Sequence, residues 1–170
     1  ELRQEAITAS IPIQYVPSAA LNKFANKNHQ GAIAISSPII YVDYKEMITR
    51  LFESGENPLI LILDGVTDVR NFGAIARNAV CLGVHLLIIP TRGSALINED
   101  AVKTSAGALF QLPVSRVTHL AECVMYIKEC GLKIVAVTEK ATVSISDEEL
   151  DGPLAFVLGG EESGVSKPIL

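Results

Sequence analysis

Two apolar runs in this chain each end in a polar turn that carries glycine, and they constrain the fold more than any other feature. Residues 59–63 read LILIL and are followed by Asp64 and Gly65, while residues 155–158 are followed by Gly159 and Gly160. A run that is apolar at consecutive positions predicts a strand buried on both faces, as in a parallel sheet. Open α/β sheets bind ligands beyond the carboxyl ends of their strands. We therefore expect both turns to form site loops on one edge of one sheet.

Strand-like and helical patterns alternate along most of the chain. The strand-like segments are residues 31–36, 59–63, 85–89, 132–137 and 154–158, with a weaker sixth at 112–117. The helical candidates are residues 44–54, 70–82, 99–109 and 120–130, with a short acidic one near Asp147. This alternation predicts an α/β fold: a Rossmann-like, mostly parallel sheet with right-handed crossovers and helices on both faces.

Residues that favour helix ends support these boundaries. Four side chains that can accept a hydrogen bond from a helix's first turn precede the four long candidates, namely Asp43, Asp68, Asn98 and Thr118. Gly83 and Gly131 follow two of them, where a helix commonly ends.

The first 42 residues have a different pattern from the rest. Residues 11–17 predict a short edge-type strand between prolines, residues 18–25 a capped helix, and residues 26–31 a polar turn. We interpret residues 1–42 as a remnant of an N-terminal domain with its linker, and residues 43–170 as the α/β domain. The chain starts without methionine and stops at Leu170, directly after the second loop, so we expect both ends to be cuts in a longer protein.

Composition and charge limit the classes of partner that this chain is expected to bind. No apolar run approaches the roughly 20 residues that span a bilayer, so no membrane partner is expected. The net charge of −5 argues weakly against nucleic acid, because phosphate binding depends on lysine and arginine. Charge distribution matters more than the sum, however, and a local basic patch stays open because five cations lie in or beside predicted loops: Arg70, Arg77, Arg92, Lys103 and Arg116.

Cysteine and histidine usage indicates neither disulfides nor a metal. Cys81, Cys123 and Cys130 form no CxxC pair, and we expect free thiols in a reducing, cytoplasmic compartment. His29 and His85 have no cysteine or carboxylate at metal-ligand spacing, so no metal site is expected.

Each site loop carries residues that could bind or react. Gly73 and Arg77, four apart, share one helix face, and an arginine near a helix N-terminus opposes the helix dipole, which suggests a partner anion. A solvated arginine on an ordinary helix is the alternative. In the second loop, the Glu161 carboxylate suits a ribose hydroxyl or a cation, and the alternative is a glycine-rich turn with a capping glutamate. Neither loop is GxGxxG, so dinucleotide binding is poorly supported.

Both loops also match a known family. Residues 64–77 read DGVTDVRNFGAIAR, which resembles the first signature of the SpoU (TrmH-type) RNA 2′-O-ribose methyltransferases, knotted enzymes that use S-adenosylmethionine. Residues 158–166 read LGGEESGVS and resemble their second signature, and residues 104–108, TSAGA, also look like a family segment. Residues 11–16 and 28–31 look like the family's junction between an N-terminal RNA-binding domain and the catalytic core, which implies that residues 1–42 are a remnant of the RNA-binding domain and residues 43–170 the SpoU-type catalytic domain. The similarity covers nearly the whole chain and is strongest toward the branch that methylates a guanosine of large-subunit ribosomal RNA.

The resemblance implies roles for matched residues. Asn71 and Arg77 correspond to the family's active-site pair, and Glu161 corresponds to its acidic residue. Gly159, Leu158 and Gly160 would bind the methyl donor through their backbone, as would Thr138 at the preceding strand end. The family description has the arginine activate the ribose 2′-hydroxyl. Because arginine is a poor proton acceptor at neutral pH, we favour phosphate binding and stabilisation of the developing alkoxide.

Two departures from the family pattern stand out. Val69 replaces the usual proline of the first motif, and the third motif, which threads the knot and completes the donor pocket, is missing from these 170 residues. We therefore expect the chain as it stands to bind the donor weakly and to leave the knot open.

The resemblance implies S-adenosylmethionine-dependent 2′-O-methylation of a ribose in structured RNA, most simply ribosomal RNA with transfer RNA as a further candidate, by a homodimer. The alternatives are a non-catalytic RNA-binding or ribosome-associated homologue and, explaining neither motif, a small-molecule nucleotide-binding domain.

Overall fold

The computed structural model describes residues 2–8, 11, 13–23, 29–34 and 37–170, which belong to two compact units, residues 1–36 and 37–170. The first unit contains α1 (Leu2–Thr8) and α2 (Ser18–Leu21). The described parts of segments 11–17 and 31–36 form no strand, so these two predictions are wrong there, and residues 12, 35 and 36 lie outside the described residues. The predicted helix at 18–25 stops at Leu21, with residues 24 and 25 outside the described part.

Part of the predicted turn at 26–31 is described. The Gly31 backbone N–H donates to Nδ1 of His29 at 3.0 Å, while residues 26–28 lie outside the described residues. The assignment of residues 1–42 to an RNA-binding remnant stays a prediction.

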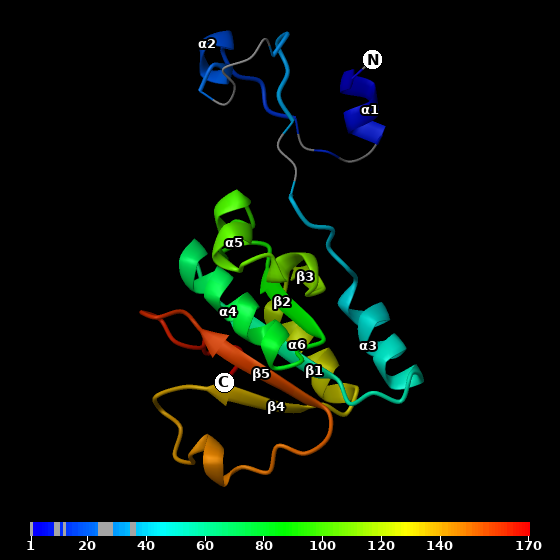
Figure 1. Cartoon of the computed structure of the whole chain (residues 1–170), viewed down its shortest axis with the longest axis vertical. Coiled ribbons are helices and arrows are strands. Elements are labelled where there is room, and N and C mark those ends of the chain that lie inside the picture. Colours follow the sequence, from blue (N-terminus) through cyan, green and yellow to red (C-terminus); the bar gives the residue numbers. More distant parts are fainter. Residues whose placement is uncertain (1, 9–10, 12, 24–28, 35–36) are drawn as a thin grey trace. The chain divides into compact units, whose positions relative to one another are not determined.

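The second unit is built on one five-stranded sheet (Figure 1). Its strands are β1 (Leu59–Asp64), β2 (Leu86–Pro90), β3 (Val114–Val117), β4 (Lys133–Val137) and β5 (Leu154–Gly159). The spatial order is β3-β2-β1-β5-β4, and every pairing between these strands is parallel. The parallel α/β sheet expected from the sequence is confirmed, including the weak strand at 112–117.

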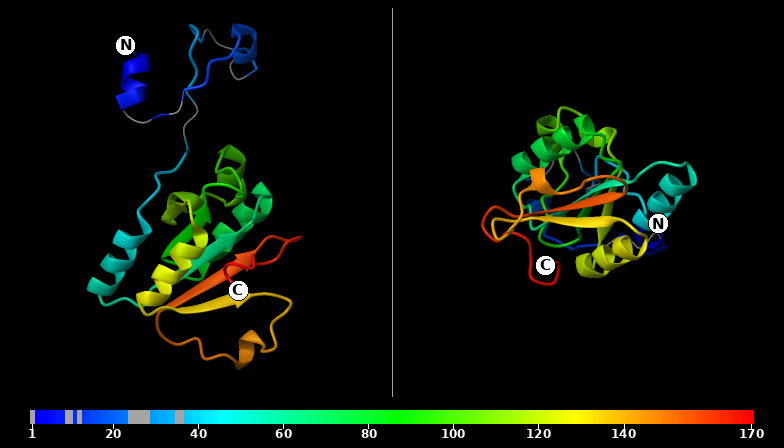
Figure 2. Two further views of the ribbon diagram at one scale, coloured as in Figure 1. Left: turned by 180° about the vertical axis from the view of Figure 1, so that it is seen from behind. Right: turned by 90° about the horizontal axis from the view of Figure 1, so that it is seen from below.

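Helices cover both faces of the sheet, seen roughly edge-on in the right-hand view of Figure 2. The helical segments are α3 (Tyr44–Glu53), α4 (Val69–Cys81), α5 (Glu99–Thr104), η1 (Ala108–Phe110), α6 (Leu120–Glu129) and η2 (Ile145–Asp147). One core packs α4, α5 and η1 against Leu61, Leu63 and Leu87, and a second packs α3 and α6 against Ile60 and Ile62. Alternate residues of one strand thus enter opposite cores, which explains the unbroken apolar run.

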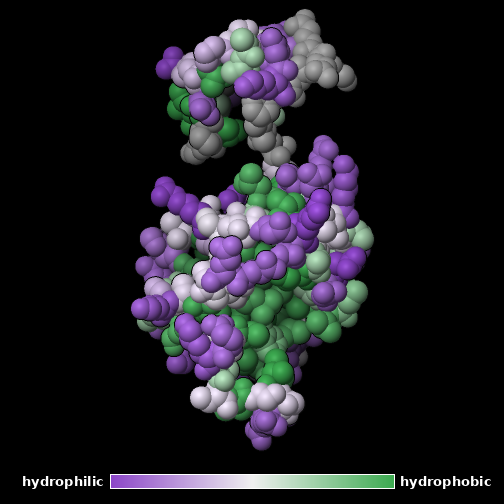
Figure 3. Space-filling view, turned by 90° about the vertical axis from the view of Figure 1, so that its left-hand side faces the viewer, coloured by the Kyte–Doolittle hydropathy of each residue, from purple (hydrophilic) through white to green (hydrophobic). Residues whose placement is uncertain are grey.

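Strand β4, at the edge of the sheet, is less covered than its neighbours. Val137 is 45% exposed, and Val143 and Ile145 of the following segment are 51% and 54% exposed. Figure 3, viewed from the side toward which β4 and β5 point in Figure 1, shows hydrophobic surface between hydrophilic side chains, reaching the lower end of the molecule. No helix among the described residues is long and apolar enough to span a bilayer.

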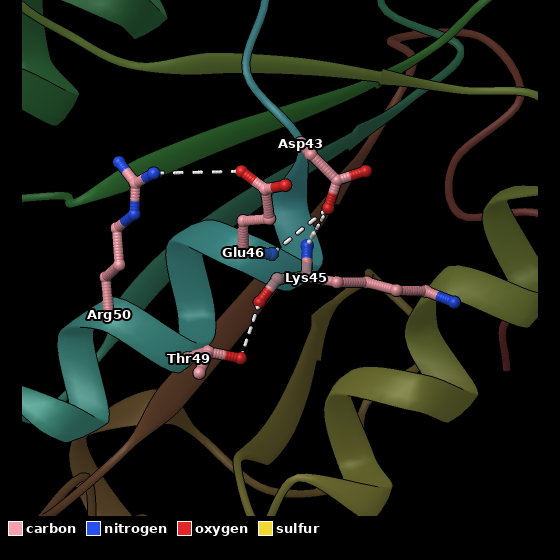
Figure 4. Close-up of polar contacts among 5 residues, drawn as sticks. All are labelled: Asp43, Lys45, Glu46, Thr49 and Arg50. Carbon is pink, nitrogen blue, oxygen red and sulfur yellow. Dashed lines mark hydrogen bonds and ion pairs between the residues drawn. The ribbon is translucent and has the colours of Figure 1, made fainter.

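Three of the four predicted N-caps are confirmed. Asp43 accepts from the backbone N–H of Lys45 at 2.8 Å and of Glu46 at 3.0 Å (Figure 4). Asp68 and Asn98 cap α4 and α5 in the same way. Thr118 does not cap α6: the helix starts after His119, which makes no side-chain capping bond.

The helix predicted over 99–109 is shorter than expected. α5 ends at Thr104, because Ala106 (φ 52°) and Gly107 (φ 82°) turn the chain through left-handed conformations before η1 begins. Gly83 and Gly131, also with positive φ, end α4 and α6 as the sequence predicts.

Candidate functional site

The two loops singled out in the sequence meet at the point where the strand order reverses. From β1 the chain proceeds outward to β2 and β3, then crosses to β4 and returns to β5, which pairs with β1 along its whole length. The last pair in this register is Asp64 and Gly159. Open parallel sheets bind ligands in the crevice outside such a reversal. The shared site edge expected from the sequence is therefore present between β1 and β5.

Asp64 holds the second loop at both ends. The backbone N–H of Gly160 donates to the Asp64 carbonyl oxygen at 2.8 Å, and the Ser166 N–H donates to Oδ2 of its carboxylate at 2.7 Å. Within the loop, the Gly164 N–H donates to the Gly160 carbonyl oxygen at 2.8 Å. Residues 160–166 thus form a closed loop attached to the end of β1.

Glycines allow the loops to pack backbone on backbone. A Cβ on Gly160 would lie 2.5 Å from the Gly65 carbonyl oxygen, and one on Gly159 would collide with the backbone of Gly164 and Val165. Gly65 itself has φ +81°, which L-residues rarely adopt. Side chains are excluded from this junction because the protein's own backbone occupies their space.

A hydrogen bond joins the two sequence motifs directly. Asp68 accepts from the Asn71 N–H at 2.8 Å and fixes the first turn of α4. From that turn, Nδ2 of Asn71 donates to Oε1 of Glu161 at 2.7 Å, across 90 residues of sequence. The bond leaves the second carboxylate oxygen of exposed Glu161 available to a ligand.

A cavity of about 640 Å³ opens beside this pair. Its wall consists of the β1–α4 loop, one face of α4 with Asn71, Ala74, Ile75 and Asn78, and residues 159–163. This volume lies within the usual range for small-molecule sites. The cavity therefore combines the apolar face of α4 with an amide, a carboxylate and backbone groups. Such a combination can bind a ligand that is part polar and part apolar.

The structure separates Arg77 from this cavity. Gly73 and Arg77 share one helix face as predicted, and a Cβ on Gly73 would lie 2.6 Å from Cβ of Thr104, so this face packs toward α5. Asn71 lies six residues before Arg77 and therefore on a different side of the helix. Arg77 is exposed, forms no hydrogen bond or ion pair with any described residue, and does not line the cavity.

Of the remaining predicted site residues, two line this cavity and two do not. Gly159 and Gly160 line it, whereas Leu158 is half-buried against the core under α4. Thr138 lines a second cavity, of about 590 Å³, beside β4. Val137 pairs with Leu158, so Thr138 follows β4 at the same sheet edge at which Gly159 ends β5.

Sequence reasoning missed the role of Asp64 in holding the loop. Its signal was an acidic residue directly after a strand that is apolar throughout, where a carboxylate needs a partner. His85 is structural: its Nδ1 accepts from the Leu59 N–H at 2.9 Å at the start of β1. The described residues contain no cluster of three or more potential metal ligands.

The sequence of this chain is similar to that of a known family. Residues 58–170 match the model of the SpoU rRNA Methylase family. The chain is 39% identical over 158 residues to the 23S rRNA (guanosine-2′-O-)-methyltransferase RlmB of Photobacterium profundum, covering 92% of this chain and 64% of that protein. The chain therefore spans less than two thirds of that relative's length.

Solved structures show the same fold. The SpoU methyltransferase AviRb from Streptomyces viridochromogenes, in complex with AdoMet, superposes with a TM-score of 0.58 at 29% identity, over 65% of this chain and 44% of AviRb. The TrmH/SpoU tRNA modifying enzyme of A. aeolicus gives a TM-score of 0.57 at 26% identity, over 74% of this chain and 65% of that one.

Proposed function

Because this chain belongs to the SpoU rRNA methylase family, we propose that it carries most of the catalytic domain of an S-adenosylmethionine-dependent RNA ribose 2′-O-methyltransferase. The Asn71–Glu161 hydrogen bond carries the proposal, because it joins the family's two motifs at the reversal of the sheet. Ribosomal RNA is the favoured substrate, since RlmB is named for 23S rRNA. The similarity of the A. aeolicus tRNA modifying enzyme keeps transfer RNA as a candidate.

The residues at the sheet edge fit such a donor. Backbone groups of Gly159 and Gly160 and the Asn71–Glu161 pair line a cavity of adequate size, and Thr138 lies at the neighbouring strand end. We assign donor binding to Leu158, Gly159, Gly160 and Thr138. When bound, S-adenosylmethionine supplies an electrophilic methyl group.

The chain's own side chains position the acceptor. Glu161, held by Asn71, can accept a hydrogen bond from a ribose hydroxyl through its free carboxylate oxygen. Arg77 is a cation without a partner among the described residues, so it can bind an RNA phosphate and stabilise the negative charge that develops on the 2′-oxygen as its proton passes to water. Its planar guanidinium suits bidentate phosphate contact.

Arg77 lies off the cavity of its own chain, which supports a homodimer in which a second copy completes each site. The exposed apolar residues Val137, Val143 and Ile145 offer surface of the kind that such an interface buries. Light scattering on the natural protein should give twice the monomer mass, and a monodisperse monomer would contradict the dimer.

Arg77→Ala tests the catalytic assignment. It should abolish transfer of labelled methyl groups to RNA while leaving the donor's Kd within a few-fold, because Arg77 acts on the RNA side. Arg77→Lys should restore little activity, since a point charge does not replace the fork. Arg50→Ala is the matched control and should retain activity, because the Arg50 side chain is exposed on α3.

Wild-type turnover in Arg77→Ala would show that Arg77 is an ordinary solvated side chain. A wild-type protein that binds RNA but transfers no methyl group would favour the alternative, a non-catalytic homologue that keeps the fold.

A further inference from the structure

Charge is distributed unevenly along the second unit. Between residues 65 and 119, five cationic side chains accompany three carboxylates, whereas between residues 120 and 166 nine carboxylates accompany three lysines. The first segment contains β2 and β3 and the second contains β4 and β5, on opposite sides of β1. The strand order therefore makes this asymmetry spatial at the carboxyl edge of the sheet, where Arg92 and Arg116 lie on the β2–β3 side of the Asn71–Glu161 cavity and Glu139 lies on the β4 side.

Arg116 on β3 is held in a defined orientation. Its Nη2 donates to the Thr91 carbonyl oxygen at 3.1 Å, and its guanidinium lies 5.3 Å from the ring centroid of Tyr41. The side chain remains exposed, and it forms no ion pair with any described carboxylate. A guanidinium fixed this way loses little conformational entropy when its remaining N–H groups bind an anion.

Arg92 follows Thr91 in the loop after β2 and is also exposed. The Thr91 N–H donates to the Val117 carbonyl oxygen at 2.8 Å, which fastens the loop to the end of β3 one residue beyond Arg116. Two arginines thus emerge from neighbouring strand ends with no carboxylate paired to either among the described residues.

The same loop reaches the candidate site. The Ala95 N–H donates to the Val66 carbonyl oxygen at 2.8 Å, and Val66 lines the Asn71–Glu161 cavity. Arg70, exposed on the first turn of α4, lies next to Asn71 in sequence. Arg70, Arg92 and Arg116, which we call the arginine flank, therefore continue from the cavity along the carboxyl edge of the sheet toward β3.

We propose that the arginine flank binds the phosphate backbone of the RNA, so that the acceptor strand approaches the cavity from the β3 side. The inference rests on the proposed function. Unpaired arginines attract phosphate, whereas Glu139, which follows β4, repels it at the opposite end of the edge. This arrangement gives an acidic protein one face suited to RNA and fixes the direction of the strand across the site.

The test is RNA binding and methyl transfer by Arg92→Ala/Arg116→Ala in the natural protein. Each cation removed from a phosphate contact lowers the slope of log K against log salt by about 0.7 to 0.9, so the double variant should lower it by about 1.5. RNA affinity should fall about tenfold at moderate salt, with the donor's Kd unchanged. Arg92→Ala alone, which removes no contact within the described protein, should lower the slope by about half as much.

Arg50→Ala is the matched control, because Arg50 is also exposed but lies on α3 and pairs with Glu46 at 3.8 Å (Figure 4). It should leave the slope unchanged. If both flank variants kept the slope of log K against log salt of the unsubstituted protein, and that protein transferred methyl groups, only this inference would be overturned. A wild-type protein with no salt-dependent RNA binding and no methyl transfer would overturn the proposed function as well.

Discussion

The two sides of the candidate site, namely the β1–β5 junction and strand β4, are built in different ways. At the β1–β5 junction, Ile60–Leu63 are buried, the loops pack through glycine backbone, and Asp64 fastens residues 160–166 at both ends. At β4 no residue of the strand is fully buried. The following segment has only η2 as regular structure, and Lys133 attaches it through Glu148 Oε2 at 2.7 Å and the Glu149 carbonyl oxygen at 2.8 Å.

This difference separates the predicted site residues other than Arg77 into two groups. Asn71, Glu161, Gly159 and Gly160 lie on the tightly packed junction, whereas Thr138 lies on the lightly covered edge. A packed junction presets the geometry of its polar groups, while an exposed edge leaves more of the arrangement to whatever binds there. Substitutions at the junction should therefore cost more stability than substitutions at β4.

The largest effect is expected from Gly159→Ala. The added Cβ would collide with backbone atoms of Gly164 and Val165, which cannot move unless the loop reorganises. We expect a loss of about 3 kcal/mol in the free energy of unfolding, measured by urea titration. Gly93→Ala is the control: its φ is +73° with no atom within 4 Å, so only backbone strain of about 1 kcal/mol applies. Equal losses would show that the junction is not close-packed.

Asp64→Ala should cost about 2 kcal/mol, because it leaves the Ser166 N–H without its charged acceptor. Hydrogen exchange at the Ser166 amide should accelerate, and Asp64→Asn, which keeps an acceptor oxygen, should restore part of the protection. Asp68→Ala removes a similar bond at the start of α4 and should cost about 1 kcal/mol without affecting Ser166. Unchanged exchange at Ser166 in Asp64→Ala would contradict the role of Asp64 in holding the loop.

A buried thiol on α6 should make the folded protein less stable at alkaline pH. Burial against the core that contains Ile60 raises the pKa of the Cys123 thiol from 9.0 to about 12. The unfolded chain therefore releases this proton first as pH rises. The stabilisation is complete below pH 9 and is lost between pH 9 and 12, with a slope approaching about 1.4 kcal/mol per pH unit.

Unfolding free energies between pH 8 and 11 measure this slope. Cys123→Ala should flatten it, although burial also raises the pKa of neighbouring Tyr44 to about 12 and leaves a residual slope above pH 10. Cys81→Ser is the control, because it removes an exposed thiol and leaves the buried one in place. A profile that Cys123→Ala leaves unchanged would contradict the prediction.

The smallest effect is expected at β4. Lys133→Met removes a half-exposed ion pair and should lower stability by only about 0.5 kcal/mol. Hydrogen exchange should increase between residues 140 and 149 and stay unchanged between 160 and 166. A loss as large as that of Asp64→Ala would show that the two sides are equally rigid, and the comparison would fail.

The sequence alone determined the local features of this protein. The buried strands β1, β2 and β5 appear as apolar runs, and the N-caps Asp43, Asp68 and Asn98 are encoded within three residues of the bonds they make. The α/β class and the two site loops follow from these patterns, because consecutive residues specify burial and capping. Within the second unit, His119 and Ala106 mark where this reasoning failed, at the start of α6 and after α5, and in the first unit it failed at the strands expected over residues 11–17 and 31–36.

Only the tertiary structure decided which distant groups meet. Asp64 and Ser166 are 102 residues apart, and Asn71 and Glu161 are 90 apart, so no local pattern encodes their pairing. Both contacts exist because β5 returns to lie beside β1, which depends on the packing of the whole sheet. The same packing turns Gly73 against α5 and places Arg77 away from the cavity. Strand order and helix rotation minimise the energy of the complete core, and no short segment contains that information.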